Sequence, residues 1–230
     1  MRSIQEKTTA KLIPFFVQSW SGLKNLIIMA MKLIQDNIIF KPITNEMRQL
    51  LHTFVCVKEP DIEKFFHNEA VSYSEQMLGS SYCFIDSASK EIVGAFCVAC
   101  ASIETSKMPK PMRNKLNRKI PYTKQRETYP AILLAQLAIA DKYQGQNLGD
   151  WLLDFVKCWA HDESKRLAAR FMIIDALNHP KVLSFYARNN FKYVFPTEDE
   201  EKIVEGMDFS QPLKTRFMVT DLQETSRISV

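Results

Sequence analysis

Hydrophobic and polar positions form alternating blocks along the chain, and the blocks predict strands and helices in turn. Near-continuous apolar runs at "PAILLAQLAIA" (130–140) and "ARFMIIDAL" (169–177) are typical of strands buried on both faces. Between these runs, Leu152, Phe155 and Trp159 recur at helical spacing, which predicts a helix from Leu148 to about residue 166. Further strands are expected at 37–44, in a hairpin over 81–103, at 191–196 and at 213–222.

Helices are also predicted where a capping residue or an early proline precedes apolar positions. One covers 45–56 with Thr44 as its N-cap, a second covers 60–77, and a third covers 179–190. Residues 104–129 have no clean period and contain three prolines, so we expect a long loop with at most one helical turn. The acidic run from Glu198 to Glu201 is expected to be a solvated loop. Strands and helices that alternate after a hairpin predict a mixed α/β sheet.

Composition narrows the class of protein. The 230 residues carry a net charge of +4, with 46% hydrophobic and 24% charged residues, which suits one globular domain with extensions. Because this charge is mild, nucleic-acid binding would have to depend on a local basic cluster. Five cysteines without framework spacing indicate free thiols in a reducing compartment, and therefore a cytoplasmic protein. Cys97 and Cys100 lie on opposite faces of a predicted strand, so we expect buried structural thiols and no metal.

Residues 1–36 are predicted to be an extension of a domain that covers 37–230. The segment is apolar but interrupted by polar residues, so no run reaches the roughly 18–20 apolar residues of a membrane span. It also lacks the cleavage pattern of a secretory signal. Three interpretations stay open: an amphipathic helix packed on the domain or on a membrane surface, an appendage, or a start of translation at Met29 or Met31.

The stretch "LAIADKYQGQNLGDWLL" (137–153) leads from an apolar strand through a polar turn directly into a helix. The first turn of such a helix has backbone N–H groups without partners, and these donors, with the positive end of the helix dipole, suit a phosphate or pyrophosphate. Gly145 and Gly149 lack the side chains that would keep an anion away. From the glycines alone, a connection without a ligand is an equal alternative. The turn is neither a GxxxxGK[ST] P-loop nor a GxGxxG loop.

The same stretch resembles the acetyl-CoA motif of the GNAT superfamily of N-acetyltransferases, Q/R-x-x-G-x-G/A. Gln144 takes the first position, Asn147 stands where glycine is usual, and Gly149 takes the last. Since asparagine tolerates a left-handed backbone, we expect the turn to form with Asn147. The segment "ALNHPKVLSFYARNNFKYV" is similar to a second family pattern, N-x-x-A-x-x-F-Y-x-x-x-G-F, with Val182 and Asn190 as departures. The matching positions are Asn178, Phe185, Tyr186 and Phe191.

This resemblance implies the GNAT fold, a mixed, mostly antiparallel sheet flanked by helices, in which the strands ending at Ile139 and Ala176 splay apart at the acetyl-CoA site. The pantetheine arm would pair with the main chain of Leu137, Ala138 and Ile139 like an added strand. Tyr186 would donate to the departing CoA thiolate as the general acid. The other residues implied to contact acetyl-CoA are Gln144, Gly145, Gln146, Asn147, Leu148, Gly149, Asp150 and Asn178.

No residue is an obvious general base. By residue type the candidates are His179, Glu104, Glu127 and Asp141, each of which suits an ordinary surface or capping role as well. An α-amino group, with a pKa of about 7.7–8.0, is substantially neutral at cellular pH, whereas lysine at about 10.4 is not. The lack of a clear base therefore favours an α-amine as the acceptor.

The stretch 107–126 carries eight Lys or Arg residues and no acidic residue. Such a cluster can follow a phosphate backbone, although a solvated basic loop is the alternative. We expect Arg113, Lys115, Arg118 and Lys119 to contact nucleic acid.

The segment "HTFVCVKEPDIEKFFHNEA" resembles the opening of one GNAT branch, the acetyltransferase toxins of bacterial toxin–antitoxin modules. Its F-x-C-x-x-x-x-L-x-x-(F/W) pattern is matched by Phe54, Cys56, Ile62 and Phe66 or Phe65. This resemblance implies acetylation of the α-amine of aminoacyl-tRNA, a homodimer, and a small DNA-binding antitoxin as partner. Two alternatives stay open: an acetyltransferase for a small amine, peptide or protein N-terminus, and a non-enzymatic acetyl-CoA-binding module.

Overall fold

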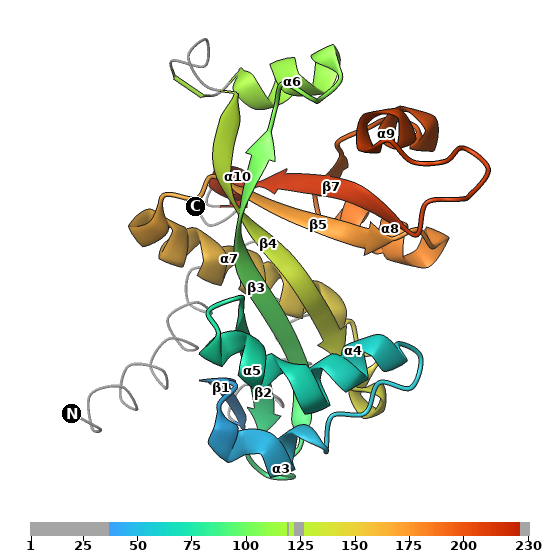
Figure 1. Cartoon of the computed structure of the whole chain (residues 1–230). Coiled ribbons are helices and arrows are strands. Elements are labelled where there is room, and N and C mark those ends of the chain that lie inside the picture. The colour runs from blue at the N-terminus through green and yellow to red at the C-terminus, as the bar shows by residue number, and fades with distance from the viewer. Residues whose placement is uncertain (1–36, 119, 122–126, 226–230) are drawn as a thin grey trace. The chain divides into compact units, whose positions relative to one another are not determined.

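The computed structural model describes residues 37–118, 120–121 and 127–225 (Figure 1). Seven strands form one sheet in the order β1-β2-β3-β4-β5-β7-β6. Strands β4 and β5 are parallel, whereas the pairs β1–β2, β2–β3, β5–β7 and β6–β7 are antiparallel. The predicted mixed, mostly antiparallel sheet with flanking helices is confirmed.

The described chain divides into two compact units. The first contains the residues up to Ala99 and the segment Gln136–Leu153, and the second contains Cys100–Ala135 and Asp154–Thr225. The assignment of 37–230 to one domain stays a prediction, and the interpretations of residues 1–36 lie outside the described residues.

The first unit begins with the short strand predicted at 37–44. Its elements are β1 (Ile38–Pro42), the 3-10 turn η1 (Asn45–Met47), α3 (Arg48–Leu51), α4 (Pro60–Lys64), the π-helical turn η2 (Phe65–Glu69), α5 (Ala70–Glu75), β2 (Ser80–Asp86), most of β3 (Ile92–Glu104), the end of β4 (Thr128–Ile139), the 3-10 turn η4 (Asp141–Tyr143) and the start of α7 (Leu148–Leu167).

Aromatic residues form the core of this unit. Phe54 and Phe66 are fully buried and meet edge to face, with ring centroids 5.3 Å apart. Cys56 and Phe65 belong to the same core, and helices α3, α4 and α5 are grouped against the strands (Figure 1). The residues that carried the toxin-like pattern are therefore also packing residues.

Two predicted helices of the first unit differ from the structure. The one expected at 45–56 ends at Leu51, because the chain turns at Thr53, whose hydroxyl donates to the carbonyl of Leu50 at 2.7 Å. Thr44 occupies the N-cap position, but its side chain makes no capping hydrogen bond. The helix expected at 60–77 starts at Pro60 as predicted, yet a π-helical turn interrupts it and it ends at Glu75.

The second unit holds the remainder of the chain that the structure describes. Its elements are the end of β3, α6 (Lys110–Asn117), the start of β4, the rest of α7, β5 (Phe171–Leu177), α8 (Pro180–Arg188), β6 (Lys192–Tyr193), α9 (Glu198–Glu205), β7 (Thr215–Asp221) and α10 (Leu222–Thr225).

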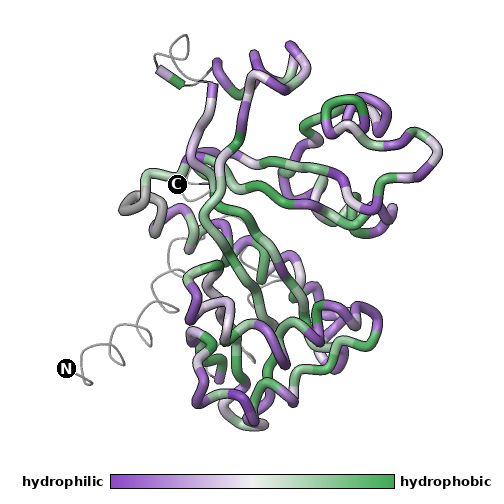
Figure 2. The backbone as a smooth tube through the Cα atoms, viewed as in Figure 1, coloured by the Kyte–Doolittle hydropathy of each residue, from purple (hydrophilic) through white to green (hydrophobic). Residues whose placement is uncertain are grey.

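The expected long loop at 104–129 was wrong in part, because it contains the helix α6. Met112 and Leu116, one helical turn apart, are buried in the core of the second unit with Ile103, Tyr129 and Phe171. The hydropathy colouring changes from hydrophobic in the neighbouring strands to mostly hydrophilic around α6 (Figure 2). In the sequence, two apolar residues one turn apart were too few to predict a helix in a stretch that contains three prolines.

The acidic run at 198–201 is not a solvated loop but the first turn of α9. Thr197 caps this helix, since its hydroxyl accepts a hydrogen bond from the N–H of Glu200 at 3.2 Å. Acidic residues are favourable at a helix N-terminus, so the run stabilises α9. Glu201 is 5% exposed and pairs with the buried Arg216, whose Nε lies 2.7 Å from its carboxylate.

Burial separates the two thiols of the CxxC. Cys97 is buried and Cys100 is exposed, so the prediction that both are buried was wrong for Cys100. In the part of the chain that the structure describes, no helix is both long and apolar enough to cross a membrane.

Candidate functional site

The turn after β4 has the backbone that the sequence predicted. It is exposed from Gln144 to Asn147, and Gly145 and Asn147 have positive φ angles of 81° and 58°. Asn147 thus adopts the left-handed conformation that glycine usually supplies. The N–H of Trp151 bonds the carbonyl of Asn147 at 3.5 Å, so the amides before it belong to the open first turn of α7. The turn therefore presents several backbone donors at the positive end of a 20-residue helix.

Asp141 fixes the beginning of this turn. One carboxylate oxygen accepts a hydrogen bond from the Gln144 side chain at 2.8 Å, and the other accepts one from the N–H of Val57 at 2.9 Å. The N–H of Asp141 donates to the carbonyl of Val55 at 2.8 Å, and Gln144 also donates to the carbonyl of Ile139 at 3.2 Å. The first residue of the acetyl-CoA motif is thus tied to the end of β4.

A second set of contacts fixes the same turn from the β2–β3 hairpin. Lys142 pairs with the carboxylate of Glu91, and Tyr143 donates to that carboxylate at 3.3 Å. The hydrogen bond from Lys142 lowers the pKa of Glu91. The hydroxyl groups of Ser89 and Tyr143 lie 3.2 Å apart. Ser89 and Lys142 are exposed and Glu91 and Tyr143 are partly exposed, so these contacts position the turn more than they stabilise the protein.

The end of β4 is close to β3 because β3 has a glycine there. A Cβ atom on Gly94 would lie 2.8 Å from Cδ1 of Ile139 and 3.1 Å from the carbonyl oxygen of Ala138. Leu137, Ala138 and Ile139 are only partly buried, unlike a strand buried on both faces. An apolar and partly open strand end is suited to a ligand that adds to it.

The parallel pairing of β4 with β5 is short. Within the described residues its register consists of Ala131 with Phe171, Ile132 with Met172 and Leu133 with Ile173. Beyond these pairs β5 continues to Leu177 in register with β7, and β4 continues to Ile139. The register thus ends before both strands do, as a splay requires.

Tyr186 lies on α8 in a small aromatic group. Its ring meets those of Phe185 and Phe191 at centroid distances of 5.0 and 5.5 Å. Burial raises the pKa of Tyr186 to about 12. Its hydroxyl has no hydrogen-bond partner among the described residues. The hydroxyl of Tyr186 is therefore protonated at neutral pH and can donate a hydrogen bond.

The C-terminus of α8 is fixed as firmly as the turn. Asn190 has a positive φ of 68°, so it provides the left-handed residue for which the family pattern has glycine. Lys157, which is 3% exposed, pairs with Asp154 at 2.7 Å and donates to the carbonyl of Asn189 at 3.3 Å. The second of these contacts ties α7 to the end of the helix that carries Tyr186.

Other candidates named from the sequence have structural roles. The side-chain amide of Asn178 donates to Glu198 and to the carbonyl of Leu213, each at 2.9 Å, so its contact with acetyl-CoA stays a prediction. His179 caps α8, and Glu104 pairs with Lys107, which lowers the pKa of Glu104. Among the described residues the side chain of Glu127 makes no contact that assigns it a role, and the carboxylate of Asp141 holds Val57 and Gln144.

Of the predicted nucleic-acid contacts, Arg113 and Lys115 lie on α6 and Arg118 is its C-cap residue. Lys115 and Arg118 are exposed and Arg113 is partly exposed, while Met112 and Leu116 face the core. None of these three cations has an ion pair within the described part of the second unit. Lys119 lies outside the described residues. The helix therefore places cations without ion-pair partners among the described residues on its exposed face. An irregular loop would not give this regular spacing.

Comparison with known proteins agrees with this geometry. No family model matches the chain. Over 140 residues it is 26% identical to a tRNA-acetylating toxin of Mycobacterium tuberculosis, which covers 61% of this chain and 76% of that protein. The structure of AtaT complexed with acetyl-methionyl-tRNA matches with a TM-score of 0.64 and 17% identity, over 84% of this chain and 100% of that one. A mutant of KacT matches with a TM-score of 0.63 and 17% identity, over 84% and 99%.

The chain has the GNAT fold of these toxins. AtaT has also been solved with acetyl-CoA and the C-terminus of the antitoxin AtaR, and KacT occurs in a complex with DNA. In the GNAT fold seen here, no group of three or more His, Cys, Asp or Glu side chains within the described residues could hold a metal ion.

The candidates drawn from the sequence omit one residue that the structure makes conspicuous. Asp175 lies on β5 with Ile174 and Ala176 buried on either side, yet it is itself exposed. It has neither a hydrogen bond nor an ion pair within the described residues. The signal was present in the sequence as a single carboxylate inside the apolar run "FMIIDAL".

Proposed function

We propose that this protein is an acetyl-CoA-dependent N-acetyltransferase toxin that acetylates the α-amine of aminoacyl-tRNA and so blocks translation. The observation that carries the proposal is the turn from Gln144 to Gly149, with its left-handed residues at 145 and 147 before α7. An acetyltransferase for a small amine, peptide or protein N-terminus is the alternative.

Acetyl-CoA supplies the thioester whose acetyl group is transferred. The first unit offers what this donor needs: backbone amides from Gly145 to Gly149 for the pyrophosphate, and the partly open main chain of Leu137–Ile139 for the pantetheine arm. AtaT, which shares the fold, has been solved with acetyl-CoA.

Tyr186 stabilises the leaving group. Since its pKa is about 12 and that of a thiol is about 8.5, the phenol keeps most of its proton. It therefore acts chiefly by donating a hydrogen bond to the developing thiolate. This is a weaker role than complete transfer of the proton to the sulfur. The sulfur then takes its proton as the product leaves.

The acceptor is inferred from charge and from relatives. The free cations of α6 suit a phosphate backbone. The similar protein of Mycobacterium tuberculosis is a tRNA-acetylating toxin, and AtaT was solved with acetyl-methionyl-tRNA. We further propose that the protein is a cytoplasmic homodimer and that a small DNA-binding antitoxin neutralises it. AtaT has been solved with the C-terminus of the antitoxin AtaR, and KacTA has been solved in a complex with DNA.

Transfer of labelled acetyl groups from acetyl-CoA to a pool of charged tRNA tests the proposal. We expect label on the aminoacyl end with the unmodified protein and a loss of about 100-fold or more with Tyr186→Phe. Tyr73→Phe, an exposed tyrosine on α5, is the matched control and should leave transfer unchanged. If acetyl-CoA binds but no tRNA is labelled, the tRNA acceptor is wrong. Label on small amines or peptides would then support the alternative.

A further inference from the structure

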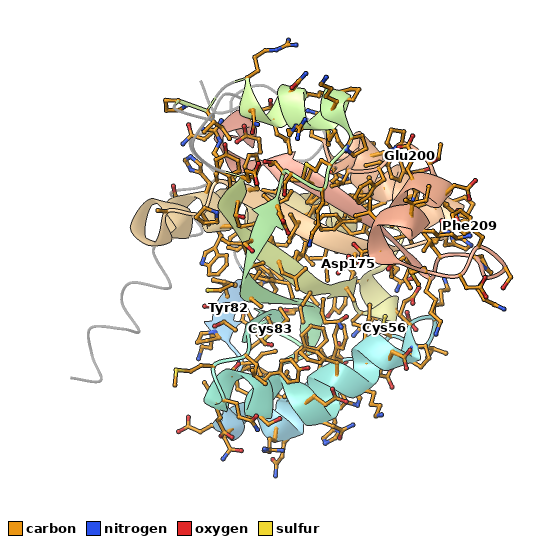
Figure 3. All side chains as sticks on the ribbon, turned by 45° about the horizontal axis from the view of Figure 1, so that its top comes forward. Cys56, Tyr82, Cys83, Asp175, Glu200 and Phe209 are labelled. Atoms are coloured by element: carbon orange, nitrogen blue, oxygen red, sulfur yellow. The ribbon has the colours of Figure 1, made fainter. Side chains whose placement is uncertain are left out.

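The loop at 54–57, which leads from α3 toward α4, has its backbone held by side chains of the helices that follow it. Nε2 of His67, in the π-helical turn η2, lies 2.7 Å from the carbonyl oxygen of Phe54. The N–H of Cys56 donates to the carboxylate of Glu63 on α4 at 2.6 Å, and Cys56 lies beside that helix (Figure 3). Connecting segments are usually more mobile than the elements they join, so a loop held in this way is notable.

His67 is placed by the π-helical turn. The consecutive residues Phe66 and His67 of this turn both contact Phe54, one through its ring at a centroid distance of 5.3 Å and the other through its Nε2. Because a carbonyl only accepts hydrogen bonds, Nε2 of His67 carries the hydrogen. The ring of His52 packs edge-on against that of His67, with centroids 4.9 Å apart. Single π-helical turns are rare and are frequent at functional sites, so this one deserves a functional test.

The far side of the loop is bonded to the turn proposed for acetyl-CoA. The carbonyl of Val55 accepts a hydrogen bond from the N–H of Asp141 at 2.8 Å, and the N–H of Val57 donates to the Asp141 carboxylate at 2.9 Å. The second oxygen of that carboxylate accepts from Gln144 at 2.8 Å. The carbonyl that His67 fixes precedes that of Val55 by one residue. All these groups belong to the first unit, so the connection lies within one compact body.

We infer that His67 is a positioning residue for the acetyl-CoA turn. His67 holds the loop at 54–57, the loop holds Asp141, and Asp141 holds the side chain of Gln144. This inference rests on the proposed function. A binding turn that is already ordered before the ligand arrives costs less to order on binding, so each bond along this path favours acetyl-CoA binding.

The burial of the loop residues separates positioning from packing. Phe54 and Cys56 are buried in the core, whereas Val55 and Val57 are 45% and 72% exposed. The exposed pair gains little from burial, yet the main chain of both residues is bonded to Asp141. Burial alone therefore does not account for the hydrogen bonds on this side of the loop, whose partner leads into the acetyl-CoA turn.

Two substitutions of His67 test this role. The side-chain nitrogen of glutamine can take the position of Nε2, whereas that of asparagine is too short to reach it. We expect His67→Asn to weaken acetyl-CoA binding by about 2- to 10-fold, which corresponds to the loss of one net hydrogen bond, and His67→Gln to restore most of the affinity. Steady-state transfer to charged tRNA should show a higher KM for acetyl-CoA with kcat nearly unchanged. A folded His67→Gln variant that binds acetyl-CoA as weakly as a variant without the donor would contradict the inference.

Asp141 allows a second test because it lies on the same path. If His67 acts through the loop, Asp141→Asn should weaken acetyl-CoA binding much less in the His67→Asn background than in the unmodified protein. Calorimetry on the two single variants and the double variant measures this coupling. Equal effects of Asp141→Asn in both backgrounds would show that the two residues act independently, and would overturn the inference.

Ser72→Ala is the matched control for stability. The hydroxyl of Ser72 donates to the carbonyl of Glu69, the last residue of η2, at 2.9 Å. This variant should melt at a lower temperature and bind acetyl-CoA as tightly as the unmodified protein. If Ser72→Ala weakens acetyl-CoA binding as much as His67→Asn, or if His67→Asn does not weaken it, the inference is wrong and the proposed function stands. An unmodified protein that binds no acetyl-CoA would overturn the proposed function, and this inference with it.

Discussion

Asp141 and Val57, which are 84 residues apart in the sequence, are joined by a hydrogen bond of 2.9 Å between a carboxylate oxygen and a backbone N–H. The other oxygen of this carboxylate holds Gln144 at 2.8 Å. One side chain therefore connects the loop after α3 to the first residue of the acetyl-CoA turn.

Replacing Asp141 by Asn should weaken acetyl-CoA binding. The amide has one acceptor oxygen, so either Val57 or Gln144 loses its partner, and we expect a loss of stability of about 1–3 kcal/mol. The freed turn should bind acetyl-CoA more weakly by calorimetry. Asp208→Asn removes a carboxylate that holds the N–H of Ser210 in the second unit, and it should leave acetyl-CoA affinity unchanged. Equal affinity in Asp141→Asn and the unmodified protein would show that the turn needs no such tie.

A methyl group at Gly94 should disturb the cofactor strand. The added Cβ would lie 2.8 Å from Ile139 and 3.1 Å from the carbonyl of Ala138, so Gly94→Ala is expected to cost about 1–3 kcal/mol and to lower acetyl-CoA affinity. Gly79→Ala is the control, because its Cβ would meet Cys97 and Val98 at 3.1 and 3.2 Å instead. It should lower the melting temperature and spare acetyl-CoA binding. The prediction fails if both variants bind acetyl-CoA equally well.

Asn147 should tolerate glycine better than alanine. Its φ of 58° costs a residue with an ordinary Cβ about 1–2 kcal/mol, whereas glycine adopts it freely. We expect Asn147→Gly to bind acetyl-CoA at least as tightly as the unmodified protein, and Asn147→Ala to bind it more weakly. Tighter binding by the alanine variant would contradict the left-handed turn.

Neutralising α6 should reduce the dependence of tRNA binding on salt. Each phosphate contact contributes about 0.7–0.9 to the slope of log K against log salt, so changing Arg113, Lys115 and Arg118 to Gln should reduce that slope by about 2–3. The matched control changes the exposed Lys41, Lys58 and Lys64 of the first unit, which alters the net charge equally. An unchanged slope for the α6 variant would place the nucleic acid elsewhere.

Asp175 should make the protein less stable as the pH rises. Its pKa in the folded state is higher than in the unfolded state, because burial and Glu205 disfavour the charged form. The folded state then binds more protons between the two pKa values, so stability falls as pH rises through that window and stays lower above it. Asp175→Asn should therefore melt at the same temperature or higher at pH 7, and the difference should vanish below about pH 4. Thermal melts from pH 3.5 to 8 measure this, and a variant that melts lower at pH 7 would point to a structural role.

Residue pattern alone was sufficient for the elements that bury long apolar runs. The strands β4 and β5 and the helix α7 follow from such runs, and the turn between β4 and α7 follows from glycine and asparagine at 145 and 147. These features depend on local chemistry, which a sequence displays directly.

Features that depend on distant partners were not predictable. The acidic start of α9 looks solvated in the sequence, because only the fold brings Arg216 of β7 to Glu201. The helix α6 looks like a loop, because only the fold provides the core in which Met112 is buried.

The bond between Glu201 and the N–H of Phe217, at 2.7 Å, has a consequence for association. Strand β6 has only two residues, so among the residues that the structure describes most of the outer edge of β7 has no partner strand. Such an edge is a template for pairing with another chain, and proteins commonly block it with a charged side chain. Glu201 occupies one of these hydrogen-bonding positions and is held there by Arg216. Truncation of Glu201 would therefore expose an aggregation-prone edge as well as an unpaired arginine.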